Sequence, residues 1–220
     1  MSHAATLVDD RRPSRGSASV ASALLVVWFG LVLCFGATDA FVAAPGVPPL
    51  GLLVAVLGPV LAFLIAYRAS PAVRAFVFTA DLRFITATQA WRFAGFGFLA
   101  LYTYRLLPAY FAWPAGLGDM AIAFSVPWML SGLARDPRFA ASRRFVVWNA
   151  LGILDLVVAV SMGALVPLLL PGLVGAAPTD PMTRLPLVLI PGFFVPGYLI
   201  LHVVALVQAR RTASESRATH

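Results

Sequence analysis

Five ionisable side chains lie within long apolar stretches of this 220-residue sequence: Asp39, Arg105, Asp119, Asp155 and His202. A charged group at membrane depth is costly, so such residues are paired or functional. Asp155 follows Arg144 by eleven residues, and His202 precedes Arg210 by eight. A helix rises about 1.5 Å per residue, which predicts that both lie deep enough to meet. An Asp–His pair would suit a proton relay, because imidazole titrates near neutral pH, or would serve only as a hydrogen bond between helices.

The other three residues, Asp39, Arg105 and Asp119, are predicted nearer one membrane surface, each close to the same end of its apolar segment. An arginine between two carboxylates balances charge where an unpaired ion costs several kcal/mol. One hypothesis is an outer polar vestibule that binds a small solute or a cation. The alternative is a structural ion pair that joins three helices.

Catalytic and metal-binding motifs are missing from the sequence. It has no HExxH, no CxxC and no histidine cluster, and its single cysteine is Cys34. A haem bound by two histidines of one chain would need a partner for His202, but His3 and His220 lie in the terminal segments. A single axial ligand or a haem shared by a dimer stays open. Catalytic residues are unknown, no metal site or cofactor is expected, and a non-enzymatic role is favoured.

The elements that must position these groups are membrane helices. Hydrophobic residues make up 60% of the chain and charged residues 11%, against about a quarter charged in soluble domains. Four stretches have no Asp, Glu, Lys or Arg, namely 16–38, 40–67, 156–179 and 185–209. Crossing a bilayer takes about 20 apolar residues, and each stretch is long enough. The lipid bilayer is therefore the expected partner.

We predict an all-α, polytopic bundle of six transmembrane helices over residues 20–208. A disordered cytoplasmic tail, 1–19, and a second cytoplasmic tail, 209–220, flank it. Arginine and phenylalanine alternate at helical spacing in 71–90, which predicts an interfacial helix or an extension of the next span. The fourth span is the weakest because Pro127 interrupts it. The expected spans are 20–42, 49–67, 91–113, 117–134, 145–170 and 185–208.

All sixteen basic residues are arginines, which we interpret as the codon bias of a GC-rich bacterial genome. With six spans, fourteen of them fall on one side, and the positive-inside rule places that side in the cytoplasm. We therefore expect a bacterial cytoplasmic (inner) membrane protein with both termini inside. The net charge of +7 is explained by this topology, so no nucleic-acid partner is expected.

The first span follows Arg11, Arg12 and Arg15, as in a signal peptide. Cleavage after Ala44 would place Pro45 next, and the apolar run continues at membrane length, so we favour a retained helix.

Prolines are concentrated near the outer ends of the predicted spans. They either end helices there or kink them to open a vestibule.

Two motifs carry a family resemblance: Leu107-Pro-Ala-Tyr-Phe-Ala-Trp-Pro-Ala-Gly-Leu-Gly-Asp119, and Leu189-Ile-Pro-Gly-Phe-Phe-Val-Pro196 followed by His202. In these the chain resembles a group of small bacterial integral membrane proteins of unknown function, from the third span onward. The resemblance implies a shared fold and membrane location, and no activity or ligand.

Three functions remain open. The first is a small-solute or proton-coupled transporter that uses Asp155 and His202. The second is a non-catalytic membrane subunit or assembly factor. The third is a membrane enzyme that acts on lipid or quinone. The oligomeric state is not predicted.

Overall fold

The protein is an all-helical bundle in the computed structural model, which describes residues 15–44, 47–170 and 179–218. No strand occurs within these ranges. The α-helices are α1 (Arg15–Ala37), α2 (Leu50–Ala69), α3 (Pro71–Thr79), α4 (Leu82–Thr88), α5 (Phe96–Thr103), α6 (Ala109–Arg135), α7 (Arg143–Leu169) and α9 (Val195–Ala218). The 3₁₀ helices are η1 (Gln89–Gly95), η2 (Pro137–Ala141) and η3 (Asp180–Thr183), and η4 (Ile190–Phe194) is a π-helix.

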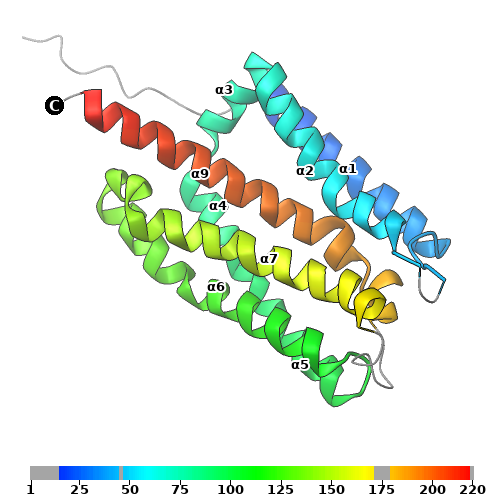
Figure 1. Ribbon diagram of the computed structural model, residues 1–220. Helices are drawn as coiled ribbons and strands as arrows, with labels where there is room; N and C mark the ends of the chain where they lie inside the picture. Colours follow the sequence, from blue (N-terminus) through cyan, green and yellow to red (C-terminus); the bar gives the residue numbers. More distant parts are fainter. Residues whose placement is uncertain (1–14, 45–46, 171–178, 219–220) are drawn as a thin grey trace, which may run out of the picture.

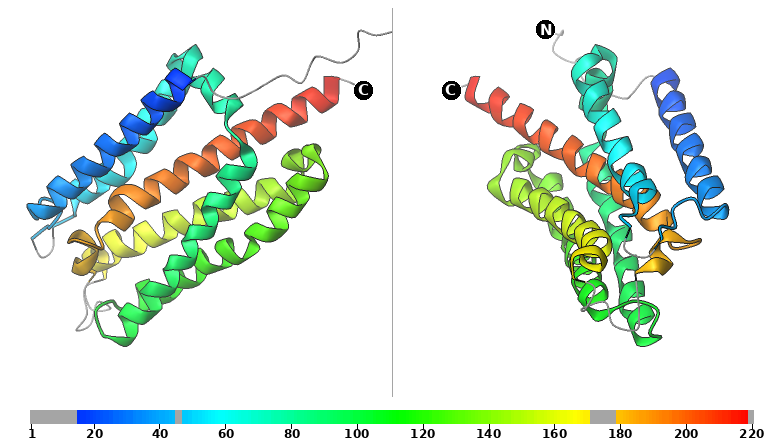
Figure 2. Two further views of the ribbon diagram at one scale, coloured as in Figure 1. Left: turned by 180° about the vertical axis from the view of Figure 1, so that it is seen from behind. Right: turned by 45° about the vertical axis from the view of Figure 1, so that its right-hand side comes forward.

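Helix α9 lies at the centre of the bundle. It packs against α2 on one side and α7 on the other, and α4 also contacts it. Helices α1 and α2 run side by side at one flank, and α6 and α7 at the other (Figures 1 and 2). The segment α4–η1–α5 runs along the length of the bundle and packs against α6 (Figure 2). Residues that meet around α9 therefore come from both halves of the chain.

Five helical segments are long and apolar enough to cross a membrane: Ala18–Ala37, Leu50–Ala69, Ala109–Arg135, Arg143–Leu169 and Ile190–Ser216. The fold class is thus confirmed as an all-α bundle of a membrane protein. The remaining predicted span corresponds to α4, η1 and α5, which follow one another over residues 82–103. Each is shorter than a single membrane-crossing helix, so the count of six stays a prediction.

The boundary predicted between the third and fourth spans was wrong. We expected a helix up to Trp113 that ends at Pro114, but the chain turns at residues 104–108 and α6 continues through Pro114 and Pro127. Pro108 directly precedes α6. A proline at the start of a helix removes no needed donor, whereas an internal one frees a carbonyl that a neighbour can satisfy.

Residues 71–90 form the helices α3 and α4 and the start of η1, and not a single helix. Ser70 caps α3 by accepting a hydrogen bond from the Val73 backbone, and Asp81 caps α4 by accepting one from the Arg83 backbone at 2.8 Å. These caps separate a short helix, 71–79, from a segment that leads into η1 and α5. Whether α3 lies at the membrane interface stays a prediction, and α4 continues directly into η1 and α5.

Helices extend into both predicted tails, and the helical residues 15–19 were predicted to be disordered. Residues 209–218 continue α9, and residues 15–19 form the start of α1. The rest of the expected disordered tail, residues 1–14, lies outside the described residues.

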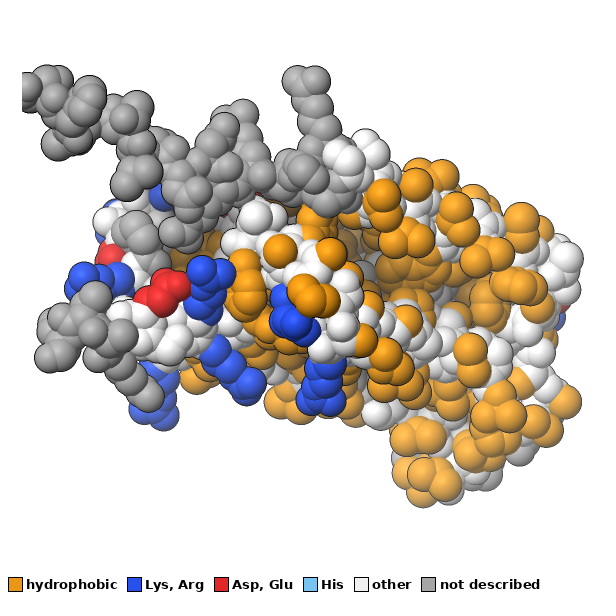
Figure 3. Space-filling model, turned by 90° about the horizontal axis from the view of Figure 1, so that it is seen from above, with side chains coloured by type: hydrophobic (Ala, Val, Ile, Leu, Met, Phe, Trp, Pro, Cys, Tyr) orange, Lys and Arg blue, Asp and Glu red, His pale blue; other side chains and the backbone are white. Residues whose placement is uncertain are grey.

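Arginines gather at one end of the bundle, which we call the arginine end (Figure 3). It carries Arg68, Arg74, Arg83, Arg135, Arg138, Arg143, Arg144, Arg210 and Arg211. The opposite end, which we call the loop end, holds residues 38–44 and 47–49, the turn at 104–108 and the segment 179–189. Hydrophobic side chains cover most of the rest of the face in Figure 3, as lipid contact requires.

Two prolines free carbonyls that side chains from distant segments then satisfy. Pro196 has no N–H to give to the carbonyl of Gly192, four residues earlier, and Trp28 Nε1 donates to that oxygen at 3.2 Å. Pro167 likewise frees the carbonyl of Gly163, which accepts a hydrogen bond from Thr179 Oγ1 at 2.9 Å. The first contact attaches α1 to η4, and the second attaches the 179–184 segment to α7.

We expect Trp28→Phe to lower the free energy of unfolding by about 1 kcal/mol, because the Gly192 carbonyl loses its side-chain donor in an apolar setting. Thermal unfolding of the detergent-solubilised protein measures this. Trp128→Phe is the matched control, since Trp128 is 68% exposed. Equal effects of the two substitutions would contradict the anchoring role of Trp28.

Candidate functional site

Arg92 is the centre of a buried polar cluster. It lies in η1, its side chain is completely enclosed, and its guanidinium contacts three helices. Nε donates to Asp119 Oδ1 on α6 at 2.7 Å, and Nη2 donates to Asp155 Oδ2 on α7. Nη1 lies 3.2 Å from His202 Nε2 on α9 and 3.4 Å from the Gly152 carbonyl. One cation thus joins α6, α7 and α9 to η1.

His202 is held in one tautomer by its neighbours. Asn149 Nδ2 donates to the Phe145 carbonyl at 2.9 Å, so Asn149 Oδ1 is the atom that accepts from His202 Nδ1, also at 2.9 Å. A guanidinium can only donate, so His202 Nε2 accepts from Arg92. His202 is therefore a neutral imidazole with its hydrogen on Nδ1. It cannot take a proton without giving up its bond to Arg92.

We call Arg92, Asp119, Asp155, His202 and Asn149 the Arg92 cluster. With both carboxylates ionised and the imidazole neutral, it carries one more negative than positive charge. An uncompensated charge in a low-dielectric interior costs several kcal/mol. A proton, or the cationic group of a bound molecule, would balance this charge.

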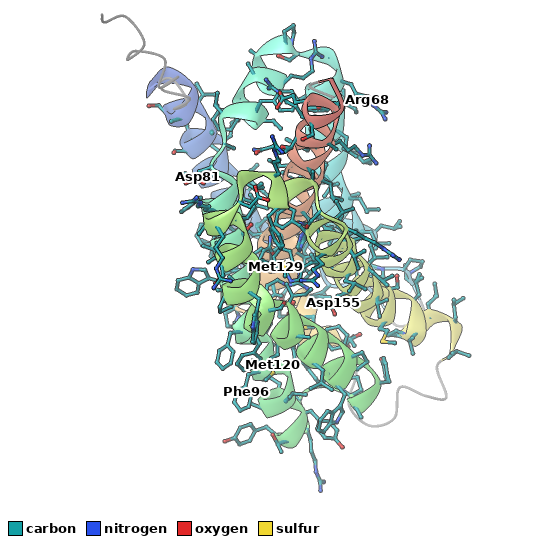
Figure 4. All side chains as sticks on the ribbon, turned by 90° about the vertical axis from the view of Figure 1, so that its left-hand side faces the viewer. Arg68, Asp81, Phe96, Met120, Met129 and Asp155 are labelled. Carbon is teal, nitrogen blue, oxygen red and sulfur yellow. The ribbon has the colours of Figure 1, made fainter. Side chains whose placement is uncertain are left out.

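Three glycines make room for the cluster. A Cβ on Gly118 would collide with the Asp155 carboxylate, one on Gly95 with Asp119, and one on Gly152 with the His202 ring. Each glycine therefore lies against a polar side chain of a neighbouring helix. Small residues at such contacts let membrane helices approach closely. Figure 4 marks Asp155 in the middle part of the bundle, between Asp81 toward one end and Phe96 toward the other.

A cavity of about 630 Å³ extends from the loop end into the bundle and reaches Asp119. Helices α2 and α7 supply much of its wall, together with Phe98, Phe111 and the segment 179–184. Asp119 is the one member of the Arg92 cluster that lines it. The carboxylates of Asp119 and Asp155 keep 16% and 15% of their side-chain surface exposed, whereas Arg92 keeps none. The cluster thus meets the cavity through Asp119.

A family model described as a domain of unknown function, DUF8737, matches residues 49–210. The chain belongs to the DUF8737 family. Comparison with curated proteins and with solved structures found no match. In this DUF8737 member the matched residues contain the whole Arg92 cluster and leave α1 outside.

The predicted Asp155–His202 pair is brought together through a third residue. Both side chains contact Arg92, and no direct hydrogen bond joins them among the described contacts. Trp148 lies edge-on to the His202 ring, with centroids 5.7 Å apart, and donates to Ser125 Oγ at 2.7 Å. In this DUF8737 protein His202 thus orients Arg92, and a proton relay through it stays a hypothesis.

The predicted vestibule of Asp39, Arg105 and Asp119 does not assemble. Asp119 faces Arg92, whereas Asp39 pairs with Arg184 at 2.9 Å on the exposed surface. Arg105 is exposed in the turn after α5. The sequence prediction placed all three at similar depth but could not tell which helix faces they occupy.

Asp39 and Arg105 share a different role, which is to end helices. Both have positive φ angles, 55° and 59°. After α1, Ala40 donates to the Phe35 carbonyl and Asp39 to that of Gly36; after α5, Leu106 donates to Leu101 and Arg105 to Tyr102. This pair of hydrogen bonds is the Schellman motif, in which a left-handed residue closes the helix.

Sequence reasoning missed Arg92 as a site residue, because its position near a predicted helix end was interpreted as an orientation charge. The distance of Arg92 from other charges was an available signal: residues 84–91 and 93–104 are uncharged, and Arg92 lies about two and a half helical turns beyond Arg83. Gln89, three residues before it, is also buried, and neither amide atom has a hydrogen-bond partner among the described residues.

No group of three or more His, Cys, Asp or Glu side chains in the described ranges is arranged to hold a metal ion.

Proposed function

We propose that this protein is a proton-coupled transporter of a small solute. The solute enters the cavity from the loop end and interacts with Asp119. Because Asp119 and Asp155 share Arg92, a charge placed at one carboxylate changes the electrostatic environment of the other. Proton exchange at the carboxylates would then accompany solute binding.

The observation that carries this proposal is the junction of the cavity with the cluster at Asp119. The attraction within an ion pair is strongest where water is excluded, so a purely structural ion pair does not require an opening to a cavity. Here Arg92 is sealed and the two carboxylates are not. Intramembrane ionisable groups that face a cavity are typical of substrate and proton pathways.

The proposed topology has six passes, with both termini in the cytoplasm of a bacterium and the cavity open to the outside. The gathering of arginines at one end of the bundle supports this orientation under the positive-inside rule (Figure 3). The length of the α4–η1–α5 segment, residues 82–103, supports a sixth pass, because 22 residues at helical rise span roughly 33 Å, enough to cross a hydrocarbon core of about 30 Å.

The alternative functions receive less support. An enzyme that uses His202 as acid or base needs that residue to reach a lipid or quinone, yet His202 is fully buried and does not line the cavity. A purely structural subunit does not need a cavity that ends on a charged group.

The test uses purified protein in liposomes that contain a pH-sensitive dye. A potassium diffusion potential is applied, and amines, acids, sugars and inorganic ions are added outside one at a time. We expect one solute class to increase proton flux above that of protein-free liposomes, and Asp155→Asn to abolish the increase. The matched control is Asp81→Asn, because asparagine also caps helices well. Transport is contradicted if no solute increases the flux, or if Asp155→Asn leaves it unchanged while both variants elute as folded protein.

A further inference from the structure

The cavity lining is mainly apolar and its unbalanced charges are negative. Among the residues that the structure describes, three charged ones line it: Asp119, Asp180 and Arg184. Arg184 is paired with Asp39 at 2.9 Å, so its charge is already balanced at the mouth. At the inner end, Asp119 shares with Asp155 the one cationic partner that the described residues give it. The cavity therefore has an excess of negative charge at depth.

Asp119 has a carboxylate oxygen to offer to a ligand. Its Oδ1 accepts from Arg92, and Oδ2 accepts no hydrogen bond from any described residue. A carboxylate accepts several hydrogen bonds through its two oxygens. The second oxygen is thus suited to contact a cationic group.

Aromatic rings in the cavity wall, between the loop end and Asp119, suit the same ligand. Phe98 and Phe111 line the cavity and contact each other edge to face, with centroids 5.5 Å apart. Ring faces attract cations, and more strongly where water is excluded. The volume of about 630 Å³ is in the range of pockets that enclose drug-sized molecules.

We infer that the cavity binds an organic monocation with a large apolar body, whose charge is balanced by Asp119. A neutral lipid or quinone would fill the cavity and contact its apolar wall, but it would leave the excess negative charge unbalanced. An anion would add to it. This inference names the solute class of the proposed transporter and so rests on that function, but binding can be measured without transport.

The experiment measures binding of tetraphenylphosphonium and tetraphenylborate to the detergent-solubilised protein by calorimetry, with empty micelles subtracted. These two ions have nearly the same shape and opposite charge. We expect the cation to bind at least about tenfold more tightly than the anion. Asp119→Asn should remove this preference, and Asp81→Asn should keep it. Equal affinities for the two ions would overturn the inference, as would an unchanged preference in Asp119→Asn.

A second variant covers the case in which Asp119→Asn fails to fold. Ala159 lines the cavity on α7 and is not among the hydrogen-bond partners of Arg92, so Ala159→Phe narrows the cavity and removes no member of the cluster. We expect it to weaken tetraphenylphosphonium binding at least about tenfold. Unchanged binding to Ala159→Phe would place the cation elsewhere and overturn the inference. A neutral lipid or quinone found bound in the wild-type cavity would also overturn it.

The two proposals fail in different ways. Cation binding with no solute-dependent proton flux would leave the binding site standing and refute transport. Solute-dependent flux with no preference for the cation would leave transport standing and refute the solute class.

Discussion

Replacing Arg92 with methionine will destabilise the protein by about 3–5 kcal/mol, because two carboxylates then lose their cation within the bundle. Asp119 and Asp155 both depend on Arg92 among the described ion pairs, so neither has a substitute partner. His202 also loses the donor to its Nε2. Thermal unfolding in detergent and the yield of monodisperse protein from membranes measure the effect.

Removing the carboxylates as well should restore much of this stability. In the triple variant Arg92→Met, Asp119→Asn, Asp155→Asn no uncompensated charge remains, and neutral groups are less costly to bury than ions. Arg143→Met is the matched control because Arg143 is exposed at the arginine end. If the triple variant is no more stable than Arg92→Met alone, charge balance is not what Arg92 provides.

Alanine at Gly118 or Gly152 will disrupt helix packing around the cluster. The new methyl group would overlap the Asp155 carboxylate in the first case and the His202 ring in the second. Overpacking costs about 1–3 kcal/mol where neighbours can move, and both neighbours here are held by hydrogen bonds to Arg92. We therefore expect a loss of about 3 kcal/mol or more for each variant, seen as a lower unfolding temperature in detergent.

The control for these variants is Gly97→Ala in α5, since a Cβ at Gly97 meets no atom within 4 Å. Alanine is the better helix former, so this change should leave stability unchanged or raise it by up to about 1 kcal/mol. If Gly118→Ala and Gly97→Ala unfold at the same temperature, α6 and α7 are not held in close contact through Gly118.

The membrane helices were predictable from the sequence because hydropathy depends on composition over about 20 residues and tolerates local errors. The helix ends were less predictable. Pro114 was interpreted as a helix end, and the actual turn ends at Pro108. Both are prolines, and only tertiary packing decides which carbonyl can be left without its helical donor.

The site was predictable in part. Asp119, Asp155 and His202 were named from their depth, and all three contact Arg92. Depth does not specify which face of a helix a residue occupies, so Asp39 and Arg105 were grouped with Asp119 although they close helices at the loop end. Arg92 was overlooked because an arginine near a helix end is equally expected as an orientation signal.

The Arg92 cluster is proposed to exchange a proton for a cation. The most direct test adds tetraphenylphosphonium to the protein in a weakly buffered detergent solution and follows the pH of that solution. Because the cation and a proton balance the same excess charge, we predict the release of about one proton for each cation bound, and none in Asp119→Asn. Saturable binding to the wild-type cavity without proton release would contradict it.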